Sequence, residues 1–366
     1  MDEQKDSPAD DSKLTDASDW SGPDDRSNPH NWSTWKKYYH TSIPTAIAFI
    51  CPFGSSVYTP GRNGVIADFG VSNEVSLLPF CLYLLGLSLG PVLAAPVSET
   101  FGRRWVYMSS LPITGLFTLG SGFAQNIQTL IILRFFAGLF SSVGLSIGTG
   151  TIADVWGQEK KGYPMSMFVA FAQLGPALGP LIGGFVAEKE SWRWTQWVLD
   201  FTVAAVILQT LGMSETYKPV ILKNRAKKLG IKGPDTGDES LAETLKYFLR
   251  KTILRPIHML FTEVIVLLFD LYIAIAFGLL NAFFAAFPLV FEEAYGFNLG
   301  SVGLTFLGQA VGTFIGFIGL LLFDSYYYQP RAQQLKKEKG MAKLPPEQRL
   351  WIAMAGAPML PISLFW

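Results

Sequence analysis

Long apolar runs recur along this chain, and they limit the folds it can adopt more than any other feature. A helix needs about 20 mostly apolar residues to cross a lipid bilayer, and nine stretches of the 366-residue sequence meet or approach that length. They cover residues 39–58, 76–97, 105–123, 128–151, 164–187, 194–212, 260–289, 301–323 and 350–366. Charged residues make up only 16% of the chain, against about 25% in a soluble domain. The sequence therefore predicts an all-α polytopic membrane protein.

Basic residues between the runs predict the orientation in the membrane. If the N-terminus is cytoplasmic, the connections on the cytoplasmic side carry 22 Lys and Arg residues, and those on the outer side carry 3. Cytoplasmic loops of membrane proteins show this excess. The first 30 residues hold nine acidic and three basic residues, which is typical of a disordered tail. We therefore expect a cytoplasmic N-terminus.

The spacing of the runs divides the chain into parts. We expect a disordered acidic cytoplasmic tail at 1–37, a six-helix bundle at 38–214, a basic cytoplasmic loop at 215–259 with an amphipathic stretch at 241–251, and a partial bundle of about three helices at 260–366. The last run has only 17 residues, and no polar segment follows it. The pattern predicts a complete N-terminal half and a C-terminally truncated second half.

The fifth run contains the sequence LGPALGPLIGG at residues 174–184. Its small and helix-bending residues are Gly175, Pro176, Gly179, Pro180, Gly183 and Gly184. Gly175, Gly179 and Gly183 recur every four residues and therefore share one helix face, where another backbone can approach closely. Gly184 lies off that face. Each proline removes a backbone hydrogen bond, so we expect a bent helix. Packing alone, without a transport role, is the alternative.

Charged residues gather at the predicted cytoplasmic ends of the second and fourth runs. The residues that we expect to form a cytoplasmic gate are Glu99, Gly102, Arg103, Arg104 and Asp154. Gly102 permits a tight turn, and Asp154 is the nearest acidic partner for an arginine. Such a network could close the cytoplasmic side in one state and release it in another. Plain anchoring of the helix ends by basic residues is the alternative.

Two ionisable residues lie inside apolar runs. Arg134 is about five residues into the fourth run, roughly 8 Å below the outer surface, and Asp270 is about 15 Å into the seventh. Ionisable residues inside membrane helices are functional candidates, so both are predicted to take part in proton coupling. The alternatives are that Arg134 extends to the outer interface and that Asp270 only bonds to a neighbouring helix.

Polar residues at cavity depth are candidates for substrate binding. They are Gln173, Asn281 and Gln309. Three aromatic residues near them, Phe283, Phe284 and Phe287, either line an apolar pocket or face lipid.

Several motifs together resemble one family, the fungal major facilitator superfamily transporters of the drug:proton antiporter type with twelve spans. Residues 95–104 (APVSETFGRR) resemble its loop motif, with Ala95 where glycine is usual and Glu99 where aspartate is common. Leu130 to Gly138, around Arg134, resembles the span-four motif implicated in proton transfer, with Ala137 replacing a usual glutamine. Residues 179–184 (GPLIGG) resemble the antiporter signature. Segments 28–39, 215–228 and 345–350 resemble fungal members specifically, and Asp270 matches no motif of the family.

The resemblance implies proton-driven export of hydrophobic drugs or toxins across the plasma membrane by alternating access. The implied partners are the lipid bilayer, protons and a small hydrophobic substrate. An uptake symporter of a small solute and a non-transporting truncated fragment are the alternatives. Because the sequence has no metal-ligand cluster, nucleophile elbow or phosphate loop, we expect no enzymatic activity, metal or cofactor, and no nucleic-acid partner.

Overall fold

The structure, a computed structural model, describes residues 19–157, 160–231, 254–339, 348 and 350–365. Its regular elements are helices, and no strand occurs within these ranges. The prediction of an all-α polytopic fold is confirmed. The amphipathic stretch at 241–251 and most of the 345–350 motif lie outside the described residues.

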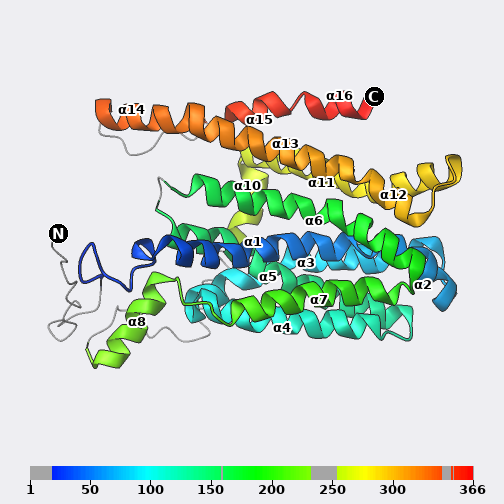
Figure 1. Cartoon of the computed structure of the whole chain (residues 1–366), viewed down its shortest axis with the longest axis horizontal. Coiled ribbons are helices and arrows are strands. Elements are labelled where there is room, and N and C mark those ends of the chain that lie inside the picture. Colours follow the sequence, from blue (N-terminus) through cyan, green and yellow to red (C-terminus); the bar gives the residue numbers. More distant parts are fainter. Residues whose placement is uncertain (1–18, 158–159, 232–253, 340–347, 349, 366) are drawn as a thin grey trace, which may run out of the picture.

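Each of the first six apolar runs coincides with one long helix. These are α1 (Thr34–Ser56), α3 (Asn73–Phe101), α4 (Arg103–Gly122), α5 (Ile127–Val155), α6 (Gly162–Lys189) and α7 (Arg193–Thr210), with the short η3 (Thr59–Gly61) and α2 (Arg62–Phe69) between α1 and α3. They lie lengthwise beside one another (Figure 1). Their core is a cluster of buried aliphatic and aromatic side chains, which includes Ile43, Ile47, Phe53, Leu199 and Val203.

Local sequence signals set the ends of several of these helices. The side chains of Ser72 and Asn126 accept hydrogen bonds from backbone N–H groups in the first turns of α3 and α5, as residues at the N-cap position commonly do. Gly102 separates α3 from α4 with a φ of +90°, a conformation that side chains strongly disfavour. The tight turn predicted at Gly102 is therefore present.

Glycines bring the helices of this bundle into close contact. A Cβ atom on Gly86 of α3 would collide with the Phe135 carbonyl oxygen of α5, and one on Gly138 of α5 would collide with the Tyr83 carbonyl oxygen of α3. Backbone approach of this kind is a main source of helix association in lipid, where apolar side chains gain little by leaving the acyl chains. The α3–α5 pair is the most extensive helix contact in the described structure.

The second half is made of interrupted helices. It comprises α10 (Arg255–Thr262), α11 (Val264–Pro288), η5 (Leu289–Ala294), α12 (Leu299–Thr305), α13 (Leu307–Phe323), η6 (Asp324–Tyr328), α14 (Gln329–Lys339), α15 (Leu350–Gly356) and α16 (Met359–Phe365). The predicted runs at 260–289, 301–323 and 350–366 are thus divided near Glu263, Phe306 and Pro358. The main contacts with the first half are those of α12 and α13 with α6.

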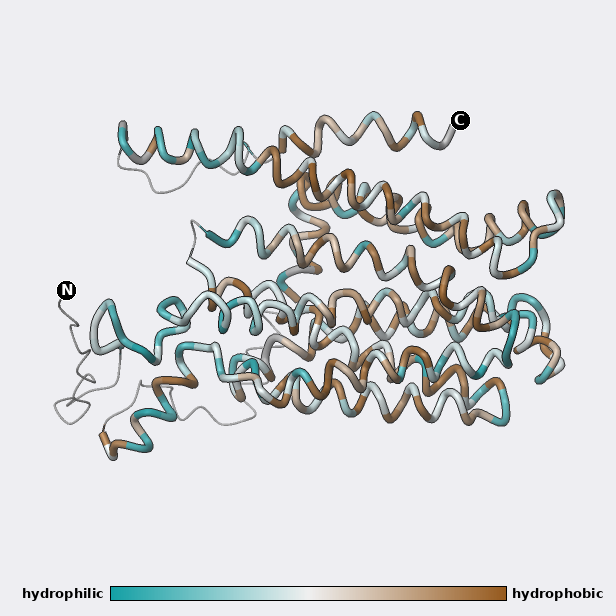
Figure 2. The backbone as a smooth tube through the Cα atoms, in the orientation of Figure 1, coloured by the Kyte–Doolittle hydropathy of each residue, from teal (hydrophilic) through white to brown (hydrophobic). Residues whose placement is uncertain are grey.

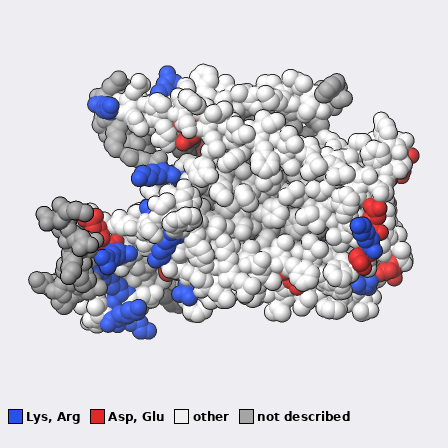
Figure 3. All heavy atoms as spheres, in the orientation of Figure 1, with Lys and Arg blue, Asp and Glu red and all other residues white. Residues whose placement is uncertain are grey.

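Apolar and charged residues are separated along the long axis of the molecule. Apolar residues dominate the middle of the bundle and hydrophilic residues its two ends (Figure 2), and most charged side chains on the face shown in Figure 3 also lie near the ends. Five described helices are long and apolar enough to cross a membrane by length and composition alone. We call the end that carries residues 19–33 and α8 (Lys218–Leu229) the N-terminal end, and the end that carries α2 the opposite end (Figure 1). The count of nine spans stays a prediction.

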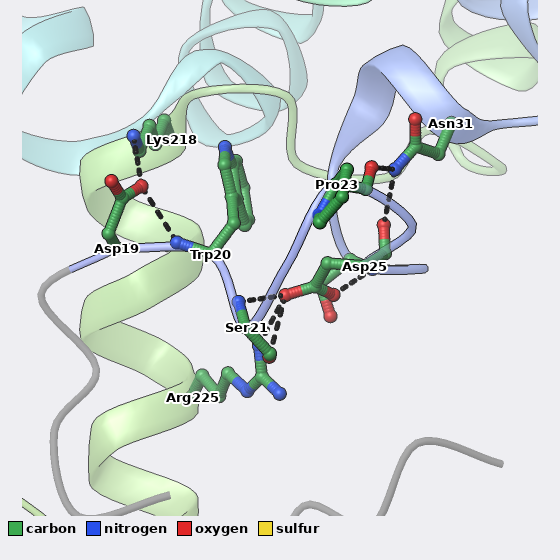
Figure 4. A network of polar contacts seen from close by, with 9 residues as sticks. Asp19, Trp20, Ser21, Pro23, Asp25, Asn31, Lys218 and Arg225 are labelled. Atoms are coloured by element: carbon green, nitrogen blue, oxygen red, sulfur yellow. Dashed lines mark hydrogen bonds and ion pairs between the residues drawn. The ribbon is translucent and has the colours of Figure 1, made fainter.

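The segment 19–33 differs from the disordered tail that its composition predicts. It forms an ordered loop docked on α8 (Figure 4). Asp19 pairs with Lys218 at 2.6 Å and Asp25 with Nη1 of Arg225 at 2.7 Å. The average composition of a segment carries no information about contacts with distant parts of the chain. Here the acidic residues pair with a basic helix, and this pairing orders the loop.

Asp25 is the centre of this loop. Its side chain is only 5% exposed, and its carboxylate also accepts hydrogen bonds from the backbone N–H groups of Ser21 and Ser27 and from the Ser21 hydroxyl. Burial alone would raise the pKa of Asp25, but these hydrogen bonds and the Arg225 guanidinium outweigh burial and hold the pKa at about 2. Asp25 is therefore an ionised structural group at neutral pH.

Candidate functional site

Arg134 occupies the interior of the six-helix bundle. Its side chain on α5 is 0% exposed, so it does not extend to the outer interface. Nη1 donates hydrogen bonds to the carbonyl oxygen of Gly54 at 2.8 Å and to Oε1 of Gln196 at 3.2 Å. The guanidinium carbon lies 4.5 Å from the ring centre of Tyr83 and 5.0 Å from that of Tyr58. Within the described ranges, no carboxylate forms an ion pair with Arg134.

Neutral groups therefore stabilise this buried charge. An unpaired cation inside a protein is costly unless polar groups solvate it. The carbonyl of Gly54 belongs to the last turn of α1, where the helix dipole is negative, and the faces of two tyrosine rings attract a cation. Sequence reasoning singled out Arg134 but missed Tyr58, Tyr83 and Gln196, because no linear motif links residues from four different helices and connections.

A second polar cluster lies at the N-terminal end, where α3, α4 and α5 end or begin. Arg103 donates from Nε to Oδ2 of Asp154 at 3.2 Å and from Nη1 to Oγ of Ser98 at 2.7 Å. Its guanidinium also lies over the ring of Tyr217, at 4.9 Å. The structure thus brings together Arg103 and Asp154, as the sequence predicted.

Glu215 completes this cluster, and it was missed by the sequence analysis. Its carboxylate accepts hydrogen bonds from the backbone N–H groups of Arg103 at 2.9 Å and Arg104 at 3.1 Å, so it caps the start of α4. It also lies so close to Gly102 that a Cβ there would collide with it. By contrast, the side chains of Glu99 and Arg104 are exposed. The position of Glu215 at the start of the 215–228 motif was the one available signal.

The antiporter-like motif on α6 packs on two sides. A Cβ on Gly175 would lie 2.5 Å from the Phe49 carbonyl oxygen, and one on Gly183 would lie 2.5 Å from that of Val57, both on the α1 side. Gly179 faces Ser56 in the same row. Pro176 and Pro180 are also buried, and α6 continues through both of them.

Gly184 lies off the face that Gly175, Gly179 and Gly183 share, as predicted, but its own side of the helix is also closely packed. A Cβ at this position would lie 2.6 Å from the carbonyl oxygen of Leu299, at the start of α12. Gly303 of α12 approaches α6 in the same way, 2.7 Å from the Pro180 carbonyl oxygen. Gly184 therefore belongs to a second close contact, between the two halves, which a search for one helix face could not reveal.

A cavity of about 570 Å³ lies between α6, α11 and the α12–α13 junction. Gln173 and Gln309 both line it, together with the aromatic side chains of Phe283 and Phe287, and its described lining contains no charged residue. Asn281 does not line it and donates a hydrogen bond to the Phe277 carbonyl within its own helix. Of the three polar candidates, the structure thus brings together the two glutamines.

A second cavity, of about 370 Å³, lies toward the opposite end between η3, α2, α11, η5 and α12. Its lining is polar as well as apolar and includes Arg62, Glu292 and Glu293. Asp270, predicted to be buried in the seventh run, is exposed on α11 and lines neither cavity. The structure does not bring Asp270 close to Arg134, and its role in proton coupling stays a prediction.

Comparisons with known proteins agree with this architecture. Residues 45–366 match the family model described as Major Facilitator Superfamily. The chain is 38% identical to polyamine transporter 4 of Saccharomyces cerevisiae over 95% of its own length, and it spans 56% of that protein. It is 36% identical to the MFS-type transporter traF of Penicillium crustosum, over 96% of this chain and 70% of the relative.

Solved structures with the same fold include a D-xylose–proton symporter. It superposes with a TM-score of 0.58 at 16% sequence identity, over 78% of this chain and 69% of the symporter. At that identity the likeness shows the fold alone.

Proposed function

This chain belongs to the Major Facilitator Superfamily, and from that premise we propose that it exports small hydrophobic molecules in exchange for protons. In this proposal residues 38–214 form one half of the transporter and 260–366 form part of the other. Rocking of the halves exposes the 570 Å³ cavity, which we call the central cavity, to each side in turn. The excess of basic residues at the N-terminal end supports a cytoplasmic N-terminus. We propose the plasma membrane as its location.

The central cavity is the observation that carries this proposal. Ligand pockets typically hold about 300–1,000 Å³, and this cavity of about 570 Å³ is lined mainly by residues of the second half, with Gln173 contributed by the first. Its aromatic and aliphatic walls favour an apolar ligand, and Gln173 and Gln309 supply hydrogen-bonding groups that can orient a carbonyl or hydroxyl. A small, largely apolar and uncharged molecule fits this lining better than an ion.

Arg134 is the proposed centre of proton coupling. Among the described residues, only neutral groups hold its guanidinium in this conformation, so a carboxylate that reaches it in another conformation would gain a strong charge-assisted hydrogen bond. Protonation of that carboxylate would weaken the bond, which links proton binding to the position of the halves. Asp270 remains the second proposed coupling residue.

We propose that a separate group of residues forms the gate at the N-terminal end. These residues are Glu99, Gly102, Arg103, Arg104, Asp154 and Glu215.

Proteoliposomes test this function directly. The chain, and the same chain extended by the last spans of a related transporter, are reconstituted with a fluorescent hydrophobic substrate and an imposed pH gradient. In the extended chain, we expect the substrate to move against its gradient in exchange for protons. This movement should stop when an ionophore removes the pH gradient. Movement that is indifferent to the pH gradient would exclude proton exchange, and movement in the same direction as protons would indicate a symporter.

A polycationic substrate is the second candidate. The yeast relative carries the name polyamine transporter, and Glu292 and Glu293 line the 370 Å³ cavity of this chain. Two carboxylates can bind the ammonium groups of an aliphatic polyamine. Competition between a polyamine and the hydrophobic substrate, measured in the same proteoliposomes with Glu292→Gln and Glu293→Gln variants, distinguishes the two. Polyamine transport that both variants weaken would favour this second candidate.

A further inference from the structure

The two cavities of this protein share an aromatic wall. Phe306 lines both the 570 Å³ cavity and the 370 Å³ cavity, and its side chain is only 2% exposed. Phe284, which is 4% exposed, lines the smaller cavity and stacks on Phe306 with ring centres 5.5 Å apart and planes 24° apart. These two rings therefore stand between the central cavity and the opposite end of the molecule.

The wall also joins the two halves of the protein. Phe284 meets Phe80 of α3 edge to face, at 6.0 Å, while Phe287 packs against Phe306 at 5.1 Å from inside the central cavity. All four side chains are apolar. Separating them breaks dispersion and ring–ring contacts but leaves no buried polar group unpaired, so the wall can part without the penalty that a broken buried ion pair would carry.

The backbone at Phe306 has the features of a hinge. It occupies the break between α12 and α13, and its N–H bonds to the Gly303 carbonyl three residues earlier instead of continuing the α-helical pattern. Gly308, two residues later, has no heavy atom within 4 Å of the position its Cβ would take. A ring at such a junction can swing with a small change in the angle between α12 and α13.

From this arrangement we propose that Phe284 and Phe306 form the gate between the central cavity and the 370 Å³ cavity, which acts as a vestibule at the opposite end. Opening of this aromatic gate admits the bound molecule to the vestibule, and its closure keeps the central cavity sealed from that side in the conformation described here. The role in substrate release rests on the proposed export function, whereas the sealing role does not.

Thiol accessibility tests the seal without requiring transport. Because Cys51 is buried and Cys81 is exposed, Cys81→Ser gives a quiet background. Gly308→Cys then places a thiol in the wall of the central cavity, and Asn63→Cys, in a separate variant, places one in the vestibule. Both are treated with a membrane-impermeant methanethiosulfonate in sealed vesicles, added to one side at a time. The side from which the Asn63→Cys variant reacts identifies the side on which the vestibule opens.

We expect the introduced thiol of Gly308→Cys to react slowly from the vestibule side, and at least tenfold faster when Phe306→Leu or Phe284→Leu is added. Phe306→Trp, which keeps an aromatic ring, should not accelerate the reaction. Phe314→Ala is the matched control, since Phe314 is 56% exposed on the same helix α13, and it should leave the rate unchanged.

An unchanged rate in both leucine variants, with normal membrane abundance, would overturn the gate. So would a thiol at position 308 that reacts as fast as the one at position 63 while both phenylalanines are intact. A protein that fails to export but shows the expected labelling would refute the proposed function and leave the gate standing.

Discussion

Nε of Arg103 donates a hydrogen bond to Oδ2 of Asp154 at 3.2 Å, which ties the first residue of α4 to the last turn of α5. Both side chains are mostly buried, with 14% and 23% exposed. Glu215, more than a hundred positions later in the chain, binds the backbone of the same arginine. Three segments that are distant in sequence therefore meet at one point at the N-terminal end.

The cap that Glu215 supplies should matter more for stability than the exposed Glu99. Glu215→Gln removes a negative charge from the start of α4, where the helix dipole is positive, and we expect a loss of about 1 kcal/mol of unfolding free energy. Thermal unfolding of the purified protein in detergent, followed by tryptophan fluorescence, measures the change. Glu99→Gln is the control and should leave the midpoint unchanged. Equal midpoints for the two variants would contradict the capping role.

Arg134 should be intolerant even of lysine. A guanidinium can bond to the Gly54 carbonyl and lie between two tyrosine rings at once, whereas an ammonium group is a compact charge with a different donor geometry. We expect Arg134→Lys and Arg134→Ala to lower proton-driven export at least roughly tenfold, which corresponds to a rise of about 1.4 kcal/mol or more in the activation free energy. The measurement is efflux normalised to membrane abundance, with Arg26→Lys, at an exposed position outside the proposed machinery, as control. Wild-type efflux by Arg134→Ala would remove this residue from the mechanism.

Gly184 should be as sensitive to a methyl group as Gly183. Alanine at position 184 would press on the Leu299 carbonyl of the other half, and at position 183 on the Val57 carbonyl at the end of α1. Overpacking of this kind typically destabilises by about 1–3 kcal/mol. Gly278→Ala is the matched control, because a Cβ there meets no heavy atom within 4 Å. Unfolding midpoints of the three variants check the prediction, and a midpoint for Gly184→Ala equal to that of the control would show that the two halves do not pack closely here.

Docking of the N-terminal loop on α8 should depend on the charge of Asp25. The pKa of Asp25 is lowered to about 2 from an ordinary value of 3.8. Its contribution, about 2 kcal/mol, is therefore fully present above pH 4 and is lost as the pH falls from about 4 to 2. At neutral pH, Asp25→Asn should mimic the protonated state and speed tryptic cleavage after the exposed Arg26 roughly tenfold or more. Asp24→Asn, at the exposed neighbouring position, is the control, and equal cleavage rates in both variants would mean that Asp25 does not hold the loop.

The sequence by itself determined the membrane architecture of this protein. Apolar runs of bilayer length leave a chain few choices other than helices, since every backbone N–H and C=O must be satisfied within its own segment. The same reasoning identified Arg134, because a charged side chain inside such a run is costly in lipid and is therefore a functional candidate. It also identified the Gly175–Gly179–Gly183 face, because the helix period fixes which residues share a side.

Only the tertiary structure decided which distant residues meet. Gly184 contacts Leu299 of the other half, Glu215 caps α4, and acidic residues of an apparently disordered tail pair with α8, because each of these contacts joins segments whose relative position no local pattern encodes. The outcome for Asp270 has the same cause: helical periodicity gives its depth along α11 but not its direction around the axis. The tertiary packing alone also placed Gln173 beside Gln309 and set Phe306 between two cavities, since a cavity is the space left between helices and belongs to none of them.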